Sequence, residues 1–431
     1  MARGAHWRRG ARGGAWAVMA AALLVGLTVA SAPPVGAAGA DWPQFRGGAD
    51  HRGWNRNETT ISAANVARLR PAWIASVLQY PPVEPVVAGN RLYVASYNEA
   101  TFQLTIKGKN PATGATLWTQ SVRSDPLVDI AGEVHNVDPR LAVAGAHLFV
   151  ASSDAVYAFD AASGRLLWRQ EALFSVSGIT VDGGALIALV QTDVNDVIYD
   201  FMVFDAASGR LRGSTSQADF TCCLVKGPAT AGGISYVDAH GLVAYTSQPR
   251  PLQGFSTSAF ARFPGQPAAA GGLVYVMQGW EQPTTTNFNL VAADSRTGAV
   301  RWKRTLVDRP DFADPGLSGS NLAVDADRVY VHYRNEGDRV ATLAAFNRWT
   351  GARVWSRPSP GDGAPTVANG VVFVAERDRG VAAYRAGTGV ELWRYPGIAD
   401  GTDPIVANGR LYVGLRPAGT SGPANLSMFE L

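Results

Sequence analysis

One eleven-residue pattern recurs eight times along the 431-residue chain and decides what the chain can fold into. Each copy joins an apolar segment, a tight Gly, Asn or Asp turn, and a segment rich in β-branched and aromatic residues. This pattern predicts two short antiparallel strands joined by a hairpin turn. The copies start 38 to 56 residues apart and read VVAGNRLYVAS (86–96), AVAGAHLFVAS (142–152), TVDGGALIALV (180–190), ATAGGISYVDA (229–239), AAAGGLVYVMQ (268–278), AVDADRVYVHY (323–333), TVANGVVFVAE (366–376) and IVANGRLYVGL (405–415).

A second pattern follows the first in most units and ends on a tryptophan, as in DAASGRLLW (160–168). An Asp or Asn opens a turn by bonding its own backbone, and a glycine four residues later takes the positive φ. A further strand such as VYAFD (156–160) lies between the two patterns. Each unit therefore holds four short antiparallel strands in about 45 residues, which is the size of a propeller blade. We expect the tryptophans at this fixed position to lock each blade to its neighbour.

The two ends of the chain predict how the ring closes. The eighth unit ends at Leu431 without its tryptophan strand, whereas residues 69–74 (LRPAWI) supply such a strand around Trp73. A degenerate unit around 229–262 lacks both the turn signature and the tryptophan. We predict an all-β fold, an eight-bladed β-propeller of four-stranded antiparallel blades whose ring is closed by an N-terminal strand. Two separate sandwiches are disfavoured because the repeat is unbroken and no Pro/Ser-rich linker divides it.

Residues 1–40 have the features of a secretory signal peptide: early arginines, an apolar stretch over residues 15–30, and small residues before a cut. Cleavage is expected after Ala40 or after Ala37, and an uncleaved membrane anchor is the alternative. The division is then 1–40 signal peptide, 41–67 N-terminal extension and 68–431 propeller. Without the leader the chain has 34 basic and 35 acidic residues, so no electrostatic footprint for nucleic acid is present. The protein is expected outside the cytoplasm, with no membrane span after leader removal.

The blade motif, Pro-x-Val-x-x-Gly-x-Leu-Tyr-Val followed by Ala-x-Asp-x-x-Thr/Ser-Gly-x-x-x-Trp, resembles the pyrroloquinoline quinone (PQQ) repeat. Residues 42–47 (WPQFRG) are similar to the opening of many secreted members. The resemblance covers residues 41–431 and implies the propeller fold. Its members include quinoprotein alcohol dehydrogenases and the propeller lipoprotein of the outer-membrane assembly complex. Because fold does not fix function, the resemblance alone does not choose between them.

Cys222 and Cys223 are the only cysteines, and they are adjacent. In an oxidising compartment such a pair forms a small disulfide ring that closes no long loop and adds little stability. In quinoprotein alcohol dehydrogenases a similar pair covers the quinone, so the resemblance implies a ligand role. A local turn clip or two buried free thiols are the alternatives. No calcium-binding motif, Cys-x-x-Cys-His haem site or metal-ligand spacing of histidines is present in the sequence.

The segments that precede the inner strands must converge at one mouth of the axial channel. This geometry predicts a polar ring of both charge signs, and concave mouths with converging polar groups are the usual binding-site candidates. Trp280, in a segment expected to be a long unpatterned loop, GWEQPTTTNFN (279–289), and Trp349 break the register of the blade tryptophans, and Trp280 is the better candidate for a ligand face. The candidate ligand-binding residues at this mouth are Cys222, Cys223, Lys226, Trp280, Glu84, Asp138, Arg140, Asp362 and Asp403, with Tyr80 and Asp400 alongside.

These features favour a binding or scaffold protein over an enzyme. The partner would be a protein, a small molecule or a sugar at the propeller mouth. The alternative is a quinoprotein oxidoreductase that uses pyrroloquinoline quinone with calcium or another divalent metal. The chain lacks the long insertions of the quinoprotein alcohol dehydrogenases. Of their functional residues, only the adjacent cysteines have a counterpart here.

Overall fold

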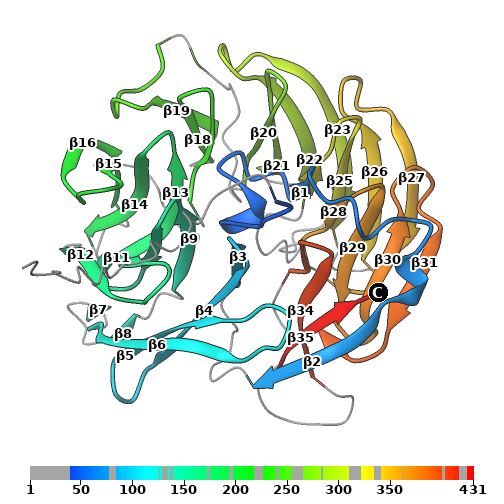
Figure 1. Ribbon diagram of the computed structural model, residues 1–431. Coiled ribbons are helices and arrows are strands. Elements are labelled where there is room, and N and C mark those ends of the chain that lie inside the picture. The colour runs from blue at the N-terminus through cyan, green and yellow to red at the C-terminus, as the bar shows by residue number, and fades with distance from the viewer. Residues whose placement is uncertain are drawn as a thin grey trace, which may run out of the picture. The chain divides into compact units, whose positions relative to one another are not determined.

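The computed structural model of the chain describes residues 39–76, 84–125, 127–128, 134–135, 139–171, 175–193, 198–217, 227–238, 242–253, 255, 266–282, 285–309, 322–333, 341–361, 363–399, 403–416 and 425–431. These residues form β-strands and two short 3-10 turns, η1 (Phe45–Gly47) and η2 (Val66–Arg68). The strands group into eight blades of a β-propeller, and each blade corresponds to one copy of the sequence repeat (Figure 1). The predicted all-β propeller is confirmed.

The first four blades use consecutive antiparallel strands. Blade 1 holds β3 (Val86–Ala88), β4 (Arg91–Asn98), β5 (Gln103–Lys109) and β6 (Thr116–Arg123). Blade 2 holds β9 (Arg140–Ala144), β10 (His147–Ala151), β11 (Ala155–Asp160) and β12 (Leu166–Glu171). Blade 3 holds β13 (Ser175–Asp182), β14 (Ala185–Asp193), β15 (Ile198–Asp205) and β16 (Leu211–Gln217). Blade 4, the degenerate unit, holds β17 (Ala229–Ala231), β18 (Ile234–Asp238) and β19 (Leu242–Thr246).

Residues 250–252 take over part of the outer-strand position of blade 4. The Thr246 amide donates to the Arg250 carbonyl (2.9 Å), and the Leu252 amide donates to the Ala244 carbonyl (2.8 Å). These two bonds satisfy backbone groups on the outer edge of β19, the edge that the outer strand pairs in a complete blade.

The remaining blades repeat the same order. Blade 5 holds β20 (Ala268–Ala270), β21 (Leu273–Gln282), β22 (Thr285–Asp294) and β23 (Val300–Arg309). Blade 6 holds β24 (Leu322–Val324), β25 (Arg328–Tyr333), β26 (Thr342–Asn347) and β27 (Arg353–Pro358). Blade 7 holds β28 (Thr366–Ala368), β29 (Val371–Glu376), β30 (Gly380–Arg385) and β31 (Glu391–Tyr395). Outside the blades lie the pair β7 (Leu127–Val128) and β8 (Val134–His135), and β32 (Ile398–Ala399), which pairs with β34.

Blade 8 is built from both ends of the chain. Its strands are β33 (Ile405–Ala407), β34 (Arg410–Arg416), β35 (Asn425–Glu430) and the N-terminal β2 (Arg70–Ser76). β2 pairs antiparallel with β35, and Trp73 lies opposite Met428 (Figure 1). The predicted closure by the strand that contains Trp73 is confirmed. This pairing covers the unpaired backbone edges that β2 and β35 would otherwise expose.

The blade tryptophans contact the turn of the next blade. Trp302 of blade 5 donates its indole N–H to the Arg348 carbonyl of blade 6 (2.9 Å), and Trp73, Trp168 and Trp355 make the equivalent bond. A Cβ on Gly351, in the same turn as Arg348, would lie 2.6 Å from the Trp302 ring. The turn glycine therefore gives both a positive φ of 68° and room for the indole. The predicted role of these tryptophans in locking neighbouring blades is confirmed.

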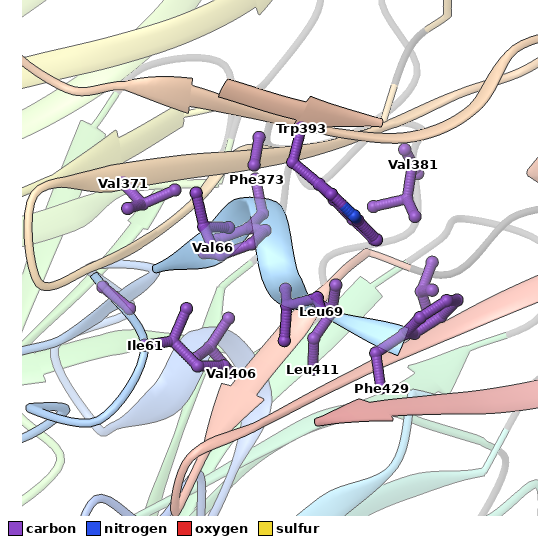
Figure 2. Packing of buried hydrophobic residues seen from close by; sticks show 14 of the residues in the cluster. Ile61, Val66, Leu69, Val371, Phe373, Val381, Trp393, Val406, Leu411 and Phe429 are labelled. Carbon is purple, nitrogen blue, oxygen red and sulfur yellow. The ribbon is translucent and has the colours of Figure 1, made fainter. Parts of the chain in front are cut away.

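The apolar core lies between blades. The described residues form eight buried clusters, and each cluster combines residues of two neighbouring blades. At the interface of blades 7 and 8, Ile61, Val66 and Leu69 from the stretch around η2 fill the space beside Phe373 and Phe429 (Figure 2). The chain before β2 thus takes part in the core as well as in ring closure.

Candidate functional site

Residues 40–55, called the axial segment here, run past the inner strands of the blades in blade order. Trp42 exchanges two backbone hydrogen bonds with Val87 of blade 1 (2.8 Å each). The Pro43 carbonyl accepts from the Val143 amide of blade 2 (2.7 Å). The Gln44 side-chain amide both donates to and accepts from the backbone of Val181 in blade 3 (3.1 and 2.9 Å).

The other five blades are reached in the same way. Backbone amides of blades 4 to 7 donate to carbonyls of the axial segment, in the pairs Thr230 to Ala49, Ala269 to Asp50, Val324 to Arg52 and Val367 to Gly53, at 2.5–2.9 Å. In blade 7 the contact extends to a parallel pairing of β1 (Trp54–Asn55) with β28. The Asn55 side chain donates to the Val406 carbonyl of blade 8 (2.8 Å). Each partner in the blades is the second residue of the repeated pattern, so one segment satisfies the inner edge of all eight blades. Figure 1 shows β1 among the inner strands.

Arg46 places a guanidinium at the start of several inner strands. The side chain is 1% exposed, and Nη2 donates to the carbonyls of Leu322 and Pro365 (2.6 Å each). Nη1 lies 3.6 Å from the Asp403 carboxylate. Burial lowers the pKa of Arg46, and the charges of Asp403 and Glu84 oppose that shift. A buried arginine thus stands between two carboxylates that both belong to the predicted mouth.

His51 and Phe45 complete the buried part of the axial segment. The His51 ring is 2% exposed and contacts Phe45 edge-on at 5.0 Å. Its Nε2 lies 3.2 Å from the Thr180 hydroxyl, which itself donates to the Pro228 carbonyl (2.8 Å). Burial, followed by the charge of Arg46, lowers the pKa of His51 to about 3, so the ring is neutral at neutral pH. Arg46 and His51 also hold left-handed backbone angles, with φ of 56° and 52°. Non-glycine residues adopt these angles only where the surroundings impose them.

Three of the predicted mouth residues are described with their side chains, and two of them come together. Glu84 and Asp403 both act on Arg46. Asp403 also accepts a hydrogen bond from the Ala364 amide (2.7 Å). Arg140 is half-buried at the start of β9. The prediction of a loop at 279–289 is wrong, because Trp280 lies in β21 and pairs with Asn287 of β22; only its backbone is described. The candidates outside the described residues are Cys222, Cys223, Lys226, Asp138, Asp362, Tyr80 and Asp400. The ligand role of the whole set remains a prediction.

The sequence analysis missed the central position of Arg46. It used WPQFRG only as a resemblance and treated residues 41–67 as an extension. Part of the signal was present, because Trp42 and Phe45 within four residues suit burial more than an exposed arm. Its partners come from blades 6, 7 and 8, and no local pattern in the chain points to them.

The described mouth residues alone do not supply a calcium site, and the adjacent cysteines that would cover a quinone lie outside the described residues. A calcium ion needs several oxygen ligands with negative charge. The described carboxylates there, Glu84 and Asp403, already face the buried guanidinium of Arg46. Within the described ranges, no group of three His, Cys, Asp or Glu side chains could hold a metal ion. In that same part of the chain, no helix has the length and apolar character needed to cross a bilayer.

Comparison with known proteins agrees with this architecture. The family profile described as outer membrane protein assembly factor BamB matches residues 103–314 and 286–420. The chain is 24% identical to the outer membrane protein assembly factor BamB of Yersinia pestis over 290 residues, which is 63% of this chain and 67% of that protein.

Solved structures show the same fold at low identity. A europium-containing methanol dehydrogenase superposes with a TM-score of 0.68 at 14% identity, over 92% of this chain and 98% of its own. The quinohemoprotein alcohol dehydrogenase of Comamonas testosteroni gives 0.67 at 15% identity, over 91% and 81%. BamB of Moraxella catarrhalis gives 0.54 at 16% identity, over 87% and 100%. With the profile match spanning most of the chain, the protein belongs to the PQQ-repeat family described as outer membrane protein assembly factor BamB.

Proposed function

We propose that this protein is a binding or scaffold propeller that works outside the cytoplasm and holds a protein partner at the mouth of the ring. One observation carries the proposal. The axial segment bonds to all eight inner strands, and its arginine neutralises the described acidic groups of the mouth. Because the axial segment holds the inner strands together, the propeller is a rigid scaffold, and its exposed loops are free to contact a partner protein.

The relatives support the same reading. The Yersinia pestis relative is named as an assembly factor of outer-membrane proteins. A role in assembly requires contact with other proteins and a location beyond the cytoplasm, in line with the leader-like residues 1–40. The likeness to dehydrogenases is below 25% identity and supports only the fold.

Position-specific photo-crosslinking in the cells that make the protein tests the partner. Glu99 and Asp378 lie in exposed connections between the second and third strands of blades 1 and 7. Because antiparallel strands alternate in direction, these connections lie on the same side as the mouth. Ser163 and Thr113, in exposed turns before the outer strands, lie on the opposite side and serve as matched controls.

A crosslinker at Glu99 or Asp378 should give a discrete protein adduct, and one at Ser163 or Thr113 should not. Adducts from the control positions alone, or from none of the four, would contradict the proposal. Mixing the full chain with pyrroloquinoline quinone and calcium should leave the quinone absorption unchanged. A shifted quinone spectrum together with alcohol oxidation would establish the oxidoreductase alternative instead.

A further inference from the structure

Because the blades repeat, residues at equivalent positions in different blades can be compared, and an unusual residue stands out. The third position of the Asx turn before the outer strand is alanine in blades 1, 2 and 3 (Ala112, Ala162, Ala207) and glycine in blade 7 (Gly387). In blades 5 and 6 the same position holds Arg296 and Trp349. The turn itself therefore does not require a large side chain there, and these two residues need another explanation.

Arg296 lines a cavity between blades 4 and 5, and Trp349 lies next to one of the glycines that line it. The cavity has a volume of about 310 Å³ and is lined by Arg296 and Ser295 of blade 5 and by Asp50 and Arg52 of the axial segment. Gly232, Gly271 and Gly272, from the hairpin turns of the two blades, also line it. A Cβ built on Gly272 would meet no atom within 4 Å, so this wall is open space.

Trp349 of blade 6 lies beside Gly271, one of the residues that line the cavity. A Cβ on Gly271 would lie 3.2 Å from the far edge of the Trp349 ring, so the indole borders the cavity wall. The side chain is 53% exposed, whereas the blade tryptophans Trp302 and Trp393 are buried at 7% and 9%. The Arg348 guanidinium lies over the Trp349 ring at 4.1 Å and holds its orientation.

The lining carries both hydrogen-bond donors and an acceptor, with an excess of positive charge. Arg52 donates to the carbonyls of Val324 and Asp325 (3.2 Å each), so neutral groups hold its charge in place. Burial lowers the pKa of Arg52, the charges of Arg348 and Arg56 act in the same direction, and those of Asp50 and Asp325 oppose the shift. Asp50 is the one carboxylate among the lining residues, against Arg52 and Arg296. Burial raises the pKa of Asp50, with the charges of Arg52 and Arg56 opposing the shift.

We propose that this cavity binds an acidic saccharide, with the sugar carboxylate at Arg52 and Arg296, hydroxyl groups at Asp50 and Ser295, and the adjoining sugar ring on Trp349. The Arg296 fork matches a carboxylate, and Arg52 adds its charge while its Nε and Nη2 stay on the carbonyls of Val324 and Asp325. An exposed indole offers a flat apolar face to a sugar ring. The acidic side chain of a peptide would supply only acceptors and would bring a second charge beside the carboxylate of Asp50, which already accepts hydrogen bonds from backbone amides, including that of Arg52. A uronic acid carries the acid and the hydroxyl donors in one ring. This site lies on the hairpin-turn side of blades 4 and 5, away from the mouth, and is independent of the protein partner proposed above.

Calorimetric titration of the full chain tests the site with two disaccharides that differ in one group. Cellobiouronic acid has a carboxylate where cellobiose has a hydroxymethyl. We expect cellobiouronic acid to bind at least about tenfold more tightly than cellobiose, since its carboxylate accepts charge-assisted hydrogen bonds that the hydroxymethyl group cannot form.

Arg296→Ala and Trp349→Ala install the residue that blades 1 to 3 carry at the same position, so the turns should stay intact. Each change should weaken cellobiouronic acid binding about tenfold. Arg165→Ala, which removes an exposed arginine from the corresponding turn of blade 2, is the matched control and should leave binding unchanged. Equal binding of the two disaccharides would overturn the proposal. It would also be overturned by undetectable binding of cellobiouronic acid, by unchanged binding in both variants, or by tighter binding of a polyglutamate peptide.

Discussion

The guanidinium of Arg46 lies 3.6 Å from the carboxylate of Asp403, and this pair joins the axial segment to the last blade. The same guanidinium donates to carbonyls of blades 6 and 7. Arg46 therefore ties three consecutive blades together at the point where the ring must close. The N-terminal β2 performs the same task at the outer edge of blade 8. The propeller is thus closed twice, once at its centre and once at its rim.

Replacing Arg46 by alanine should destabilise the protein strongly. The change removes two hydrogen bonds from buried carbonyls and the positive charge that faces the Asp403 carboxylate. We expect a loss of about 3–5 kcal/mol in the free energy of unfolding, measured by urea denaturation. Arg46→Lys keeps the positive charge but cannot reproduce the planar set of donors of the guanidinium. Its free energy of unfolding should lie between those of the unsubstituted protein and Arg46→Ala. Arg68→Ala, at an exposed arginine nearby, should change stability by less than about 0.5 kcal/mol. Equal stability of the two alanine variants would contradict the role given to Arg46.

The contact of the Trp302 ring of blade 5 with the turn of blade 6 predicts different losses of stability for two glycine substitutions. Gly351 and Gly145 both have positive φ, at 68° and 58°. A Cβ on Gly145 meets nothing within 4 Å, whereas a Cβ on Gly351 meets the Trp302 ring. Gly145→Ala should cost about 1–2 kcal/mol of stability from backbone strain alone. Gly351→Ala should cost about 1–3 kcal/mol more, because it adds overpacking.

A double-mutant cycle separates the two contributions to the Gly351 variant. In a Trp302→Ala background, the cost of Gly351→Ala should fall to that of Gly145→Ala, since the steric term is gone. Thermal or urea unfolding of the four proteins measures this. If the cost of Gly351→Ala stayed the same with and without Trp302, the blade tryptophan would not be the reason for the turn glycine.

The sequence predicted the features that repeat and missed those that occur once. Eight copies of one pattern identify the blade strands, and the missing strand of the last copy identifies Trp73 as its replacement. The axial segment has no second copy. Arg46 and His51 are buried only because eight distant inner strands surround them, and a long-range contact of this kind leaves no local periodicity. Arg296 and Trp349 stand out from the repeat in the sequence, but their position beside Asp50 and Arg52 depends on the three-dimensional arrangement.

The two closures can be separated by truncation. A chain that begins at Asn57 lacks the axial segment but keeps Glu58, the η2 cluster and β2. A chain that begins at Tyr80 lacks β2 as well. Relative to a chain beginning at Gly39, the Asn57 chain should lose about 10 °C or more in melting temperature, because the inner edges of the blades lose their partners. The Tyr80 chain should be insoluble or melt lower still. Unchanged melting of the Asn57 chain would show that the axial segment does not stabilise the ring.

His51 should make the protein less stable as the pH falls from about 6.5 to about 3. Burial and the charge of Arg46 lower the pKa of His51 to about 3 in the folded protein, below the usual value of 6.5 in the unfolded chain. Between these two pH values, His51 binds a proton in the unfolded chain but not in the folded propeller. Stability is then lost by about 1.4 kcal/mol per pH unit as the pH decreases. Above pH 6.5 the His51 imidazole is neutral in both the folded and the unfolded protein, and its contribution to stability is constant.

His51→Asn isolates that contribution, because asparagine does not titrate and tolerates the left-handed backbone that position 51 requires. Urea unfolding of both proteins between pH 4 and pH 8 measures the difference in their free energies of unfolding. That difference should be constant from pH 7 to pH 8 and should then move in favour of the asparagine variant as the pH is lowered. If the free energies of unfolding of the two proteins changed in parallel down to pH 4, His51 would not remain neutral in the folded propeller.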